Sequence, residues 1–175
     1  SKNSTISYKT NTVDIEEVMA IPNHSAGFRK MSELLMDTNQ GVIANVNDIS
    51  IVGHRVVHGG NSFSETTVIT QQVKDKIREL SVLAPLHNPH NLEGILLAEE
   101  IFGNAKQIAV FDTAFHQSMP VKAKKYALPN ELYDEHGIQA YGFHGTSHKY
   151  VSEKAISYLK LDSSRIITLH LGHGC

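Results

Sequence analysis

Residues 141–148, with the sequence YGFHGTSH, combine two glycines, two histidines and two aliphatic hydroxyls within eight positions. Glycine allows backbone N–H groups to approach an anion closely. A helix that begins just after such a loop directs its positive end at the same place. Histidine adds hydrogen-bond donors or protons. The segment therefore predicts a site for an anion.

Four further clusters rich in glycine, histidine or turn-forming residues follow predicted strands or helices, at residues 54–60, 84–90, 111–116 and 170–174. Ligands of α/β proteins bind beyond the carboxyl ends of the strands, and polar residues there are often functional. We therefore treat the five clusters as candidate parts of one site.

Arg55 and Asp112 each come at the end of an apolar run. A guanidinium can hold a carboxylate or phosphate through two parallel hydrogen bonds, although a structural salt bridge is an equal alternative for Arg55. The Asp112 carboxylate could take a proton, orient a nucleophile or hold a metal. Its alternative role is to cap a helix.

Three histidines lie beside Gly, Asn or Pro in predicted turns: His87, His144 and His170. An imidazole there could donate to a phosphoryl oxygen; the alternative for each is a buried histidine bonded to backbone. Three apolar residues are embedded in the same polar clusters: Val57, Leu86 and Phe143. They could line a small aliphatic pocket, although packing in the core is the default.

Two pairs of histidines, His54 with His58 and His144 with His148, have the spacing of four that binds zinc on a helix. Glycines interrupt any helix at both places, and no glutamate follows the first histidine. Zinc is therefore a weak hypothesis for these pairs.

The composition argues against several classes of function. The 175 residues carry a net charge of −2, from 16 basic and 18 acidic residues, so there is no basic excess for nucleic acid. No apolar run approaches the ~20 residues that cross a bilayer. A single cysteine, Cys175, excludes an internal disulfide and fits a cytoplasmic protein. The absence of an initiator Met and the final glycine loop predict a fragment.

The hydrophobic pattern predicts strands that alternate with helices, which indicates the α/β class. The expected strands cover residues 6–8, 49–53, 107–111 and 166–170. The expected helices cover residues 24–36, 70–83, 89–102 and 147–159, with Asn88 capping the third and Thr146 or Ser147 the fourth. Residues 120–140 are expected to be irregular.

Five segments, in this order and spacing, resemble the acetate kinases over roughly residues 40–175: GHRVVHGG, APLHNP, VFDTAFHQSMP, YGFHGTSHKYV and HLGHG. The resemblance implies a ribonuclease-H-like lobe of the actin-like ATPase type, with a mixed sheet flanked by helices. It also implies that residues 1–175 are an incomplete N-terminal lobe that binds the acyl substrate. The first phosphate-binding strand and the whole second lobe would be absent.

The resemblance further implies reversible, direct in-line transfer of the γ-phosphoryl group of ATP to acetate, with Mg²⁺, giving acetyl phosphate and ADP. The isolated fragment would be inactive, and the complete cytoplasmic protein would be a homodimer through the missing lobe. No metal ligand is assigned within this chain: a metal-associated glutamate would belong to the missing lobe, and Asp112 would orient acetate or the shell of the metal. Neither nucleic acid nor membrane would be a partner.

The roles of individual residues follow from the same resemblance. Asp112 would be the catalytic carboxylate, Arg55 would bind acetate or the phosphoryl group, and His144 would donate to that group during transfer. The acetate-binding residues would be Arg55, Val57, Leu86, His87 and Phe143. The residues near the phosphates would be His144, His170, Gly172, His173 and Gly174.

Two observations bear on these roles. The family usually has HLGNG where this chain has HLGHG, so His173 replaces an asparagine and puts the phosphate contact in doubt. Relatives that prefer propionate tend to have a smaller residue than Val57. The alternatives are a propionate or butyrate kinase, a pyrophosphate-dependent acetate kinase, and a non-catalytic module that binds phosphate.

Overall fold

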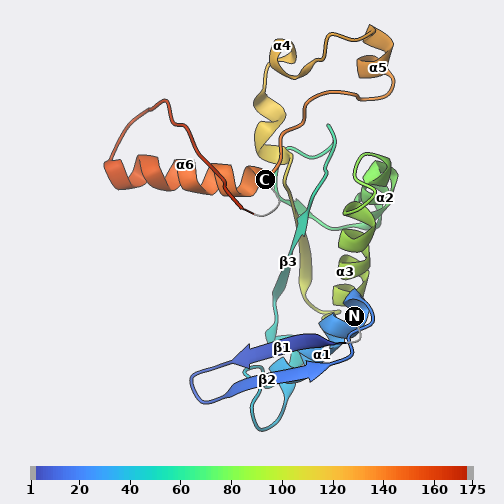
Figure 1. Cartoon of the computed structure of the whole chain (residues 1–175), viewed down its shortest axis with the longest axis vertical. Helices are drawn as coiled ribbons and strands as arrows, with labels where there is room; N and C mark the ends of the chain where they lie inside the picture. The colour runs from blue at the N-terminus through green and yellow to red at the C-terminus, as the bar shows by residue number, and fades with distance from the viewer. Residues whose placement is uncertain (1–2, 173–175) are drawn as a thin grey trace. The chain divides into compact units, whose positions relative to one another are not determined.

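The computed structural model describes residues 3–172 (Figure 1), and the chain divides into two compact units. Unit 1 comprises Ser1–His54 and His90–Ile108, and unit 2 comprises Arg55–Pro89 and Ala109–Cys175. Among the described residues, no helix has both the length and the apolar character that crossing a membrane requires.

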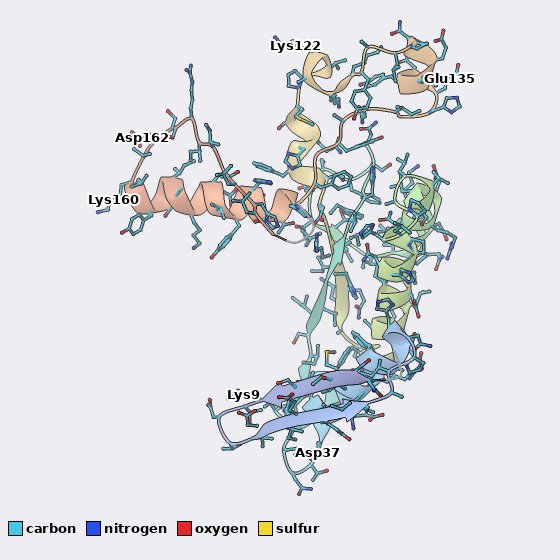
Figure 2. All side chains as sticks on the ribbon, in the orientation of Figure 1. Lys9, Asp37, Lys122, Glu135, Lys160 and Asp162 are labelled. Carbon is cyan, nitrogen blue, oxygen red and sulfur yellow. The ribbon has the colours of Figure 1, made fainter. Side chains whose placement is uncertain are left out.

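Unit 1 begins with an antiparallel hairpin of β1 (Ser4–Lys9) and β2 (Asp14–Met19), seen in Figure 1. Its register runs from the pair Ser4 and Met19 to the pair Lys9 and Asp14, which also form an ion pair beside the turn that Figure 2 labels at Lys9. The predicted strand at residues 6–8 is confirmed. The sequence analysis missed β2 because its two adjacent glutamates obscure the alternation of a strand.

The helix α1 (His24–Met36) has the predicted bounds. It begins there because the side chain of Asn23 accepts a hydrogen bond from the Ala26 N–H, 2.9 Å away. Within unit 1, Phe28 packs edge-on against Phe102, with ring centroids 6.4 Å apart. The short 3-10 helix η1 (Val46–Asp48) leads to the first strand of a second sheet.

The second sheet has the order β3-β5-β4, from strands β3 (Ile51–Val56), β5 (Lys106–Phe111) and β4 (Thr67–Val68). Strands β3 and β5 are parallel, because Lys106 N–H donates to the Ser50 carbonyl and Asp112 N–H to the Val56 carbonyl. Their carboxyl ends therefore lie at the same edge. This arrangement places the residues at those ends, Arg55 and Asp112, side by side.

In unit 2, α2 (Gln71–Glu79) begins at Thr70, whose hydroxyl accepts from the Val73 N–H, and continues as η2 (Leu80–Val82). The predicted helix at 70–83 is thus confirmed, with its last turn tightened. Phe63 stacks on Phe111 at 4.2 Å in the core of this unit. The next helix, α3 (Asn88–Ile101), belongs to unit 1 from His90 onward and ends near the predicted Gly103.

Residues 120–140, predicted to be irregular, contain two short helices, α4 (Val121–Lys124) and α5 (Asn130–Asp134), which follow η3 (Ala114–Ser118). A proline occupies the N-cap position of each of α4 and α5, where its ψ is extended at 150° and 139°, so each helix begins at the residue after the proline. The prediction was wrong because helices of four or five residues are too short to show a period.

The last helix, α6 (Gly145–Leu159), begins earlier than predicted. Neither Thr146 nor Ser147 caps it; the capping position belongs to His144, whose φ of 52° is left-handed and whose side chain makes no cap bond. At the far end Lys160 is also left-handed, with φ 53°. Figure 2 labels Lys160 and Asp162 where the chain turns back.

The strand predicted at residues 166–170 is wrong. Within the described residues this segment pairs with no strand, and Ile167 and Leu169 are 91% and 76% exposed. Instead the segment runs back beside α6 (Figure 1), where side chains of Thr168 and His170 bond to the first turns of the helix. An apolar run forms a strand only where another strand accepts its backbone hydrogen bonds.

Candidate functional site

Arg55 and Asp112 form a close ion pair at the carboxyl ends of β3 and β5. Arg55 Nε donates to both carboxylate oxygens of Asp112, at 3.0 and 3.1 Å, and its Nη2 donates to Oδ2 at 2.7 Å. The Asp112 side chain is 2% exposed, whereas the Arg55 side chain is 63% exposed. The buried carboxylate therefore orients a cation that a second anion can reach from solvent.

The start of α6 is hydrogen-bonded to the backbone of Asp112. The N–H of Gly145 donates to the Asp112 carbonyl over 2.8 Å, which brings His144 and the positive end of a helix beside Asp112. Glycine is required at this point, because a Cβ on Gly145 would collide with the Asp112 carbonyl and lie 2.9 Å from Phe115 Cβ. The predicted anion-binding segment and the ion pair thus belong to one site.

Histidines gather at the start of α6. The rings of His144 and His170 stack with centroids 4.4 Å apart. His170 Nδ1 lies 2.9 Å from Ser147 Oγ, and His148 Nδ1 lies 2.7 Å from Thr168 Oγ1. The site therefore presents half-buried imidazoles of two predicted residues, His144 and His170, next to the helix terminus.

Asn88, in the APLHNP motif, is fully buried and holds the loop after β3. Its Oδ1 accepts from the His58 N–H at 3.1 Å, and its Nδ2 donates to the His58 carbonyl at 3.0 Å. The predicted role of Asn88 as a helix cap is wrong, because the oxygen and the nitrogen of its side-chain amide both bond to the backbone of His58 instead. Beside it, Gly59 N–H donates to Thr113 Oγ1 at 3.0 Å.

The three residues predicted to hold a methyl group differ in their surroundings. Leu86 is 78% exposed, Phe143 is 43% exposed and Val57 is half-buried. Phe143 lines a hollow of about 390 Å³ together with His58 and Tyr141, but neither Val57 nor Leu86 lines it. The described contacts therefore do not test an acyl pocket of these three residues, and that pocket stays a prediction.

The remaining predicted residues are more peripheral in the structure. His87 and Gly172 are exposed. His173 and Gly174 lie outside the described residues, so the phosphate contacts expected of them stay predictions. His54 and His58 form the first of the two histidine pairs considered for zinc. His54 Nε2 lies 2.7 Å from Gln107 Oε1. In its paired residue His58, Nδ1 accepts from the Gly60 N–H at 3.0 Å.

Sequence comparison decides the family. The profile of the acetokinase family matches residues 1–175, the whole chain. The chain belongs to the acetokinase family. The acetate kinase of Flavobacterium johnsoniae is 60% identical over 172 residues, which cover 98% of this chain and 43% of that protein. Curated relatives of this group are matched over 39% to 43% of their length, so the chain spans about two fifths of them.

Solved structures place the fold within the acetokinase family as well. The acetate kinase of Porphyromonas gingivalis superposes with a TM-score of 0.82 at 40% identity, over 91% of this chain and 40% of that one. A propionate kinase of Francisella tularensis superposes with a TM-score of 0.89 at 41% identity, over 99% and 44%. The predicted fold class is therefore confirmed: an α/β lobe with a sheet flanked by helices.

Four residues of this acetokinase chain position the site, a role that was not predicted for them from sequence: Asn88, Thr113, His116 and Gly145. His116 Nε2 donates to the Phe143 carbonyl at 3.0 Å, which fixes the loop before α6. Gly142 in that loop has φ +72° and faces the His116 ring, where a Cβ would lie 2.6 Å away. All four residues lie inside the motifs that resemble the family, and this location was the sequence signal that could have found them. The sequence did not show which groups they would contact.

Replacing Gly145 with alanine is expected to lower the free energy of unfolding by about 1–3 kcal/mol, because the new methyl group overpacks the junction with Asp112. Gly94→Ala is the matched control: nothing lies within 4 Å of the place that its methyl group would take, and alanine in this helix should stabilise by about 0.5–1 kcal/mol. Urea unfolding of both variants measures the difference. Equal effects would contradict the packing argument.

The buried imidazole of His58 predicts a pH dependence of stability. Burial lowers the pKa of His58 below its ordinary value of 6.5. The unfolded chain therefore binds a proton that the folded chain does not, so stability falls as the pH falls below about 6.5. His58→Asn keeps an acceptor near the Gly60 N–H but does not titrate. Free energies of unfolding from urea titrations at pH 7.5 and 5.5 should differ less in this variant than in the parent chain, because the contribution lost with His58 is up to about 1.4 kcal/mol per pH unit; an unchanged difference would refute the assignment.

Proposed function

We propose that the whole protein carrying this chain is an acetate kinase, which transfers the γ-phosphoryl group of ATP to acetate and gives acetyl phosphate and ADP. Membership of the acetokinase family and 60% identity to an acetate kinase support this. The observation that carries the proposal for this chain is the ion pair of Arg55 and Asp112 beside the start of α6.

The proposed reaction requires mainly that the two reactants are positioned and that the negative charge of the transferring group is neutralised. Acetate is already a competent nucleophile, and phosphoryl transfer is accelerated by alignment of the two reactants and by cations around the transferring group. In the proposed reaction the exposed guanidinium of Arg55 binds acetate or the phosphoryl group, while buried Asp112 fixes its orientation. His144 and the N-terminal end of α6 add donors for developing negative charge.

The family implies magnesium, and Asp112 is the carboxylate of the proposed site. Both oxygens of Asp112 accept hydrogen bonds from Arg55. Within residues 3–172, the group of three side chains suited to a metal lies in unit 1, away from this ion pair in the chain. Magnesium is usually held by one or two carboxylates together with substrate phosphates and water, so Asp112 would supply at most part of its site, and we assign no step to the ion.

Further parts of the proposal concern the protein beyond this chain. We infer that residues 1–175 form the acyl-substrate part of the enzyme, and that the nucleotide lobe and a homodimer contact belong to the remaining length. The 39% to 43% coverage of the relatives supports this division. An inactive isolated chain and a cytoplasmic location stay predictions of the same kind.

Propionate is the second candidate acceptor, because a propionate kinase is among the similar structures. One methylene changes binding in an apolar pocket by only ~1–3 kcal/mol. Hydroxylamine trapping of acyl phosphate tests both, with the full-length protein, ATP and Mg²⁺, and acetate, propionate or butyrate offered separately. The largest kcat/KM with acetate supports the proposal. No acyl phosphate from any acid would contradict it and favour a phosphate-binding role.

A further inference from the structure

A second group of chemically active side chains lies in unit 1 and includes none of the residues assigned to phosphoryl transfer. His24 is the first residue of α1, and His90 and Glu93 lie one turn apart on α3. One possible ligand atom from each of the three lies within 4.8 Å of those from the other two. His24 is distant in sequence from the other two, so only folding brings this group together.

The three side chains face one another. The rings of His24 and His90 have centroids 5.0 Å apart, at an angle of 46°. His90 Nδ1 lies 3.5 Å from Glu93 Oε2. The other carboxylate oxygen, Glu93 Oε1, accepts a hydrogen bond of 2.7 Å from Ser25 Oγ. Ser25 thus holds one carboxylate oxygen of Glu93, and the other oxygen lies near the His90 imidazole.

The donor set suits a transition metal. Two imidazoles with one carboxylate is a known combination for zinc with a fourth position open to water. Zinc ligands at about 2.0–2.2 Å in a tetrahedron are separated from one another by about 3.4 Å. Closing the group around an ion therefore needs side-chain movements of about an ångström. His24 and His90 are exposed and Glu93 is half-exposed, so their rotamers can adjust and water can reach the ion.

The charge state also fits. The hydrogen bond from Ser25 is the largest cause that lowers the pKa of Glu93, and His90 lowers it further. The Glu93 carboxylate supplies the negative charge that a divalent cation favours, and the imidazole nitrogens of His24 and His90 supply the remaining ligands.

We propose that His24, His90 and Glu93 bind one zinc ion, which joins the start of α1 to the first turns of α3. Such an ion ties two helices of unit 1 whose packing otherwise rests on contacts such as Phe28 with Phe102. Because it binds the folded chain, it raises the melting temperature. The site is independent of the proposed phosphoryl transfer.

Calorimetric titration of the 175-residue chain with Zn²⁺, after treatment with a chelator, tests the proposal. We expect one ion per chain and a zinc-dependent rise in Tm. His24→Ala, His90→Ala and Glu93→Gln should each weaken binding at least about tenfold and remove the rise in Tm. Co²⁺ should give visible absorption bands of a four-coordinate site, which the same variants lose.

His136→Ala is the matched control, since His136 is an exposed histidine outside the group. This variant should bind zinc like the parent chain. Circular dichroism confirms that each variant is folded before titration. Failure of the folded parent chain to bind zinc, or binding that the three substitutions leave unchanged, would overturn the proposal.

Discussion

Asp112→Asn in the full-length enzyme is expected to lower kcat for acetate about 10²–10⁴-fold, the range associated with loss of a positioned catalytic group. The asparagine has nearly the same size but turns one of its two acceptors into a donor, which then opposes the Arg55 Nη2 or Nε. The guanidinium loses its orientation, and the acceptor and phosphoryl group are no longer aligned. Hydroxylamine trapping at saturating ATP and acetate measures the loss.

Glu100→Gln provides a control with a similar ion pair elsewhere. Arg29 Nη2 donates to both oxygens of Glu100, at 2.8 and 2.9 Å, but both side chains are about half exposed. An exposed pair contributes little, so kcat should be unchanged and stability should change by less than about 1 kcal/mol. Activity of Asp112→Asn within threefold of the parent would contradict the assignment of Asp112 as the catalytic carboxylate.

Asn88→Ala is expected to have the largest effect on stability, lowering the free energy of unfolding by about 2–4 kcal/mol. Asn88 is 0% exposed and satisfies both the N–H and the carbonyl of His58. Alanine leaves these two buried groups without their partner, and each unsatisfied group costs about 1–3 kcal/mol. For a chain of this length, Tm should fall by roughly 5–15 °C.

Asn104→Ala is the matched control for that change. Asn104 also makes a side-chain hydrogen bond, to Asn47 Oδ1 at 2.6 Å, but it is exposed and water can replace the bond. Its effect should stay within about 0.5 kcal/mol. Thermal unfolding followed by circular dichroism and by tyrosine fluorescence compares the two variants. Similar shifts in Tm for both would show that the buried amide does not hold the loop.

Much of the local structure could be predicted because its causes are local. The bounds of α1 follow from the apolar spacing after residue 24 and the cap at Asn23. The strand that ends at Phe111 is an unbroken apolar run from Ile108 onward. The failures have a physical reason in common. The run at 166–170 has the composition of a strand, but a strand also needs a partner, and the described chain provides none there.

The start of α6 shows the same limit at the site. Thr146 and Ser147 have the intrinsic character of helix caps, and sequence alone favours them. In the structure the helix already begins at Gly145, because its N–H is taken by the carbonyl of Asp112, a residue of another motif. A long-range hydrogen bond therefore overrides a local preference.

The sequence by itself determined the family, the α/β class and the motifs in which the site residues lie, because these depend on residue types and on spacing along the chain. Only the tertiary structure decided which of those residues meet. The pairing of Arg55 with Asp112, the anchoring of His58 by Asn88 and the meeting of His24 with His90 and Glu93 each join segments far apart in sequence. Such contacts depend on the parallel register of β3 and β5 and on helix packing. Neither can be predicted from the residue types and spacing within one segment of the chain.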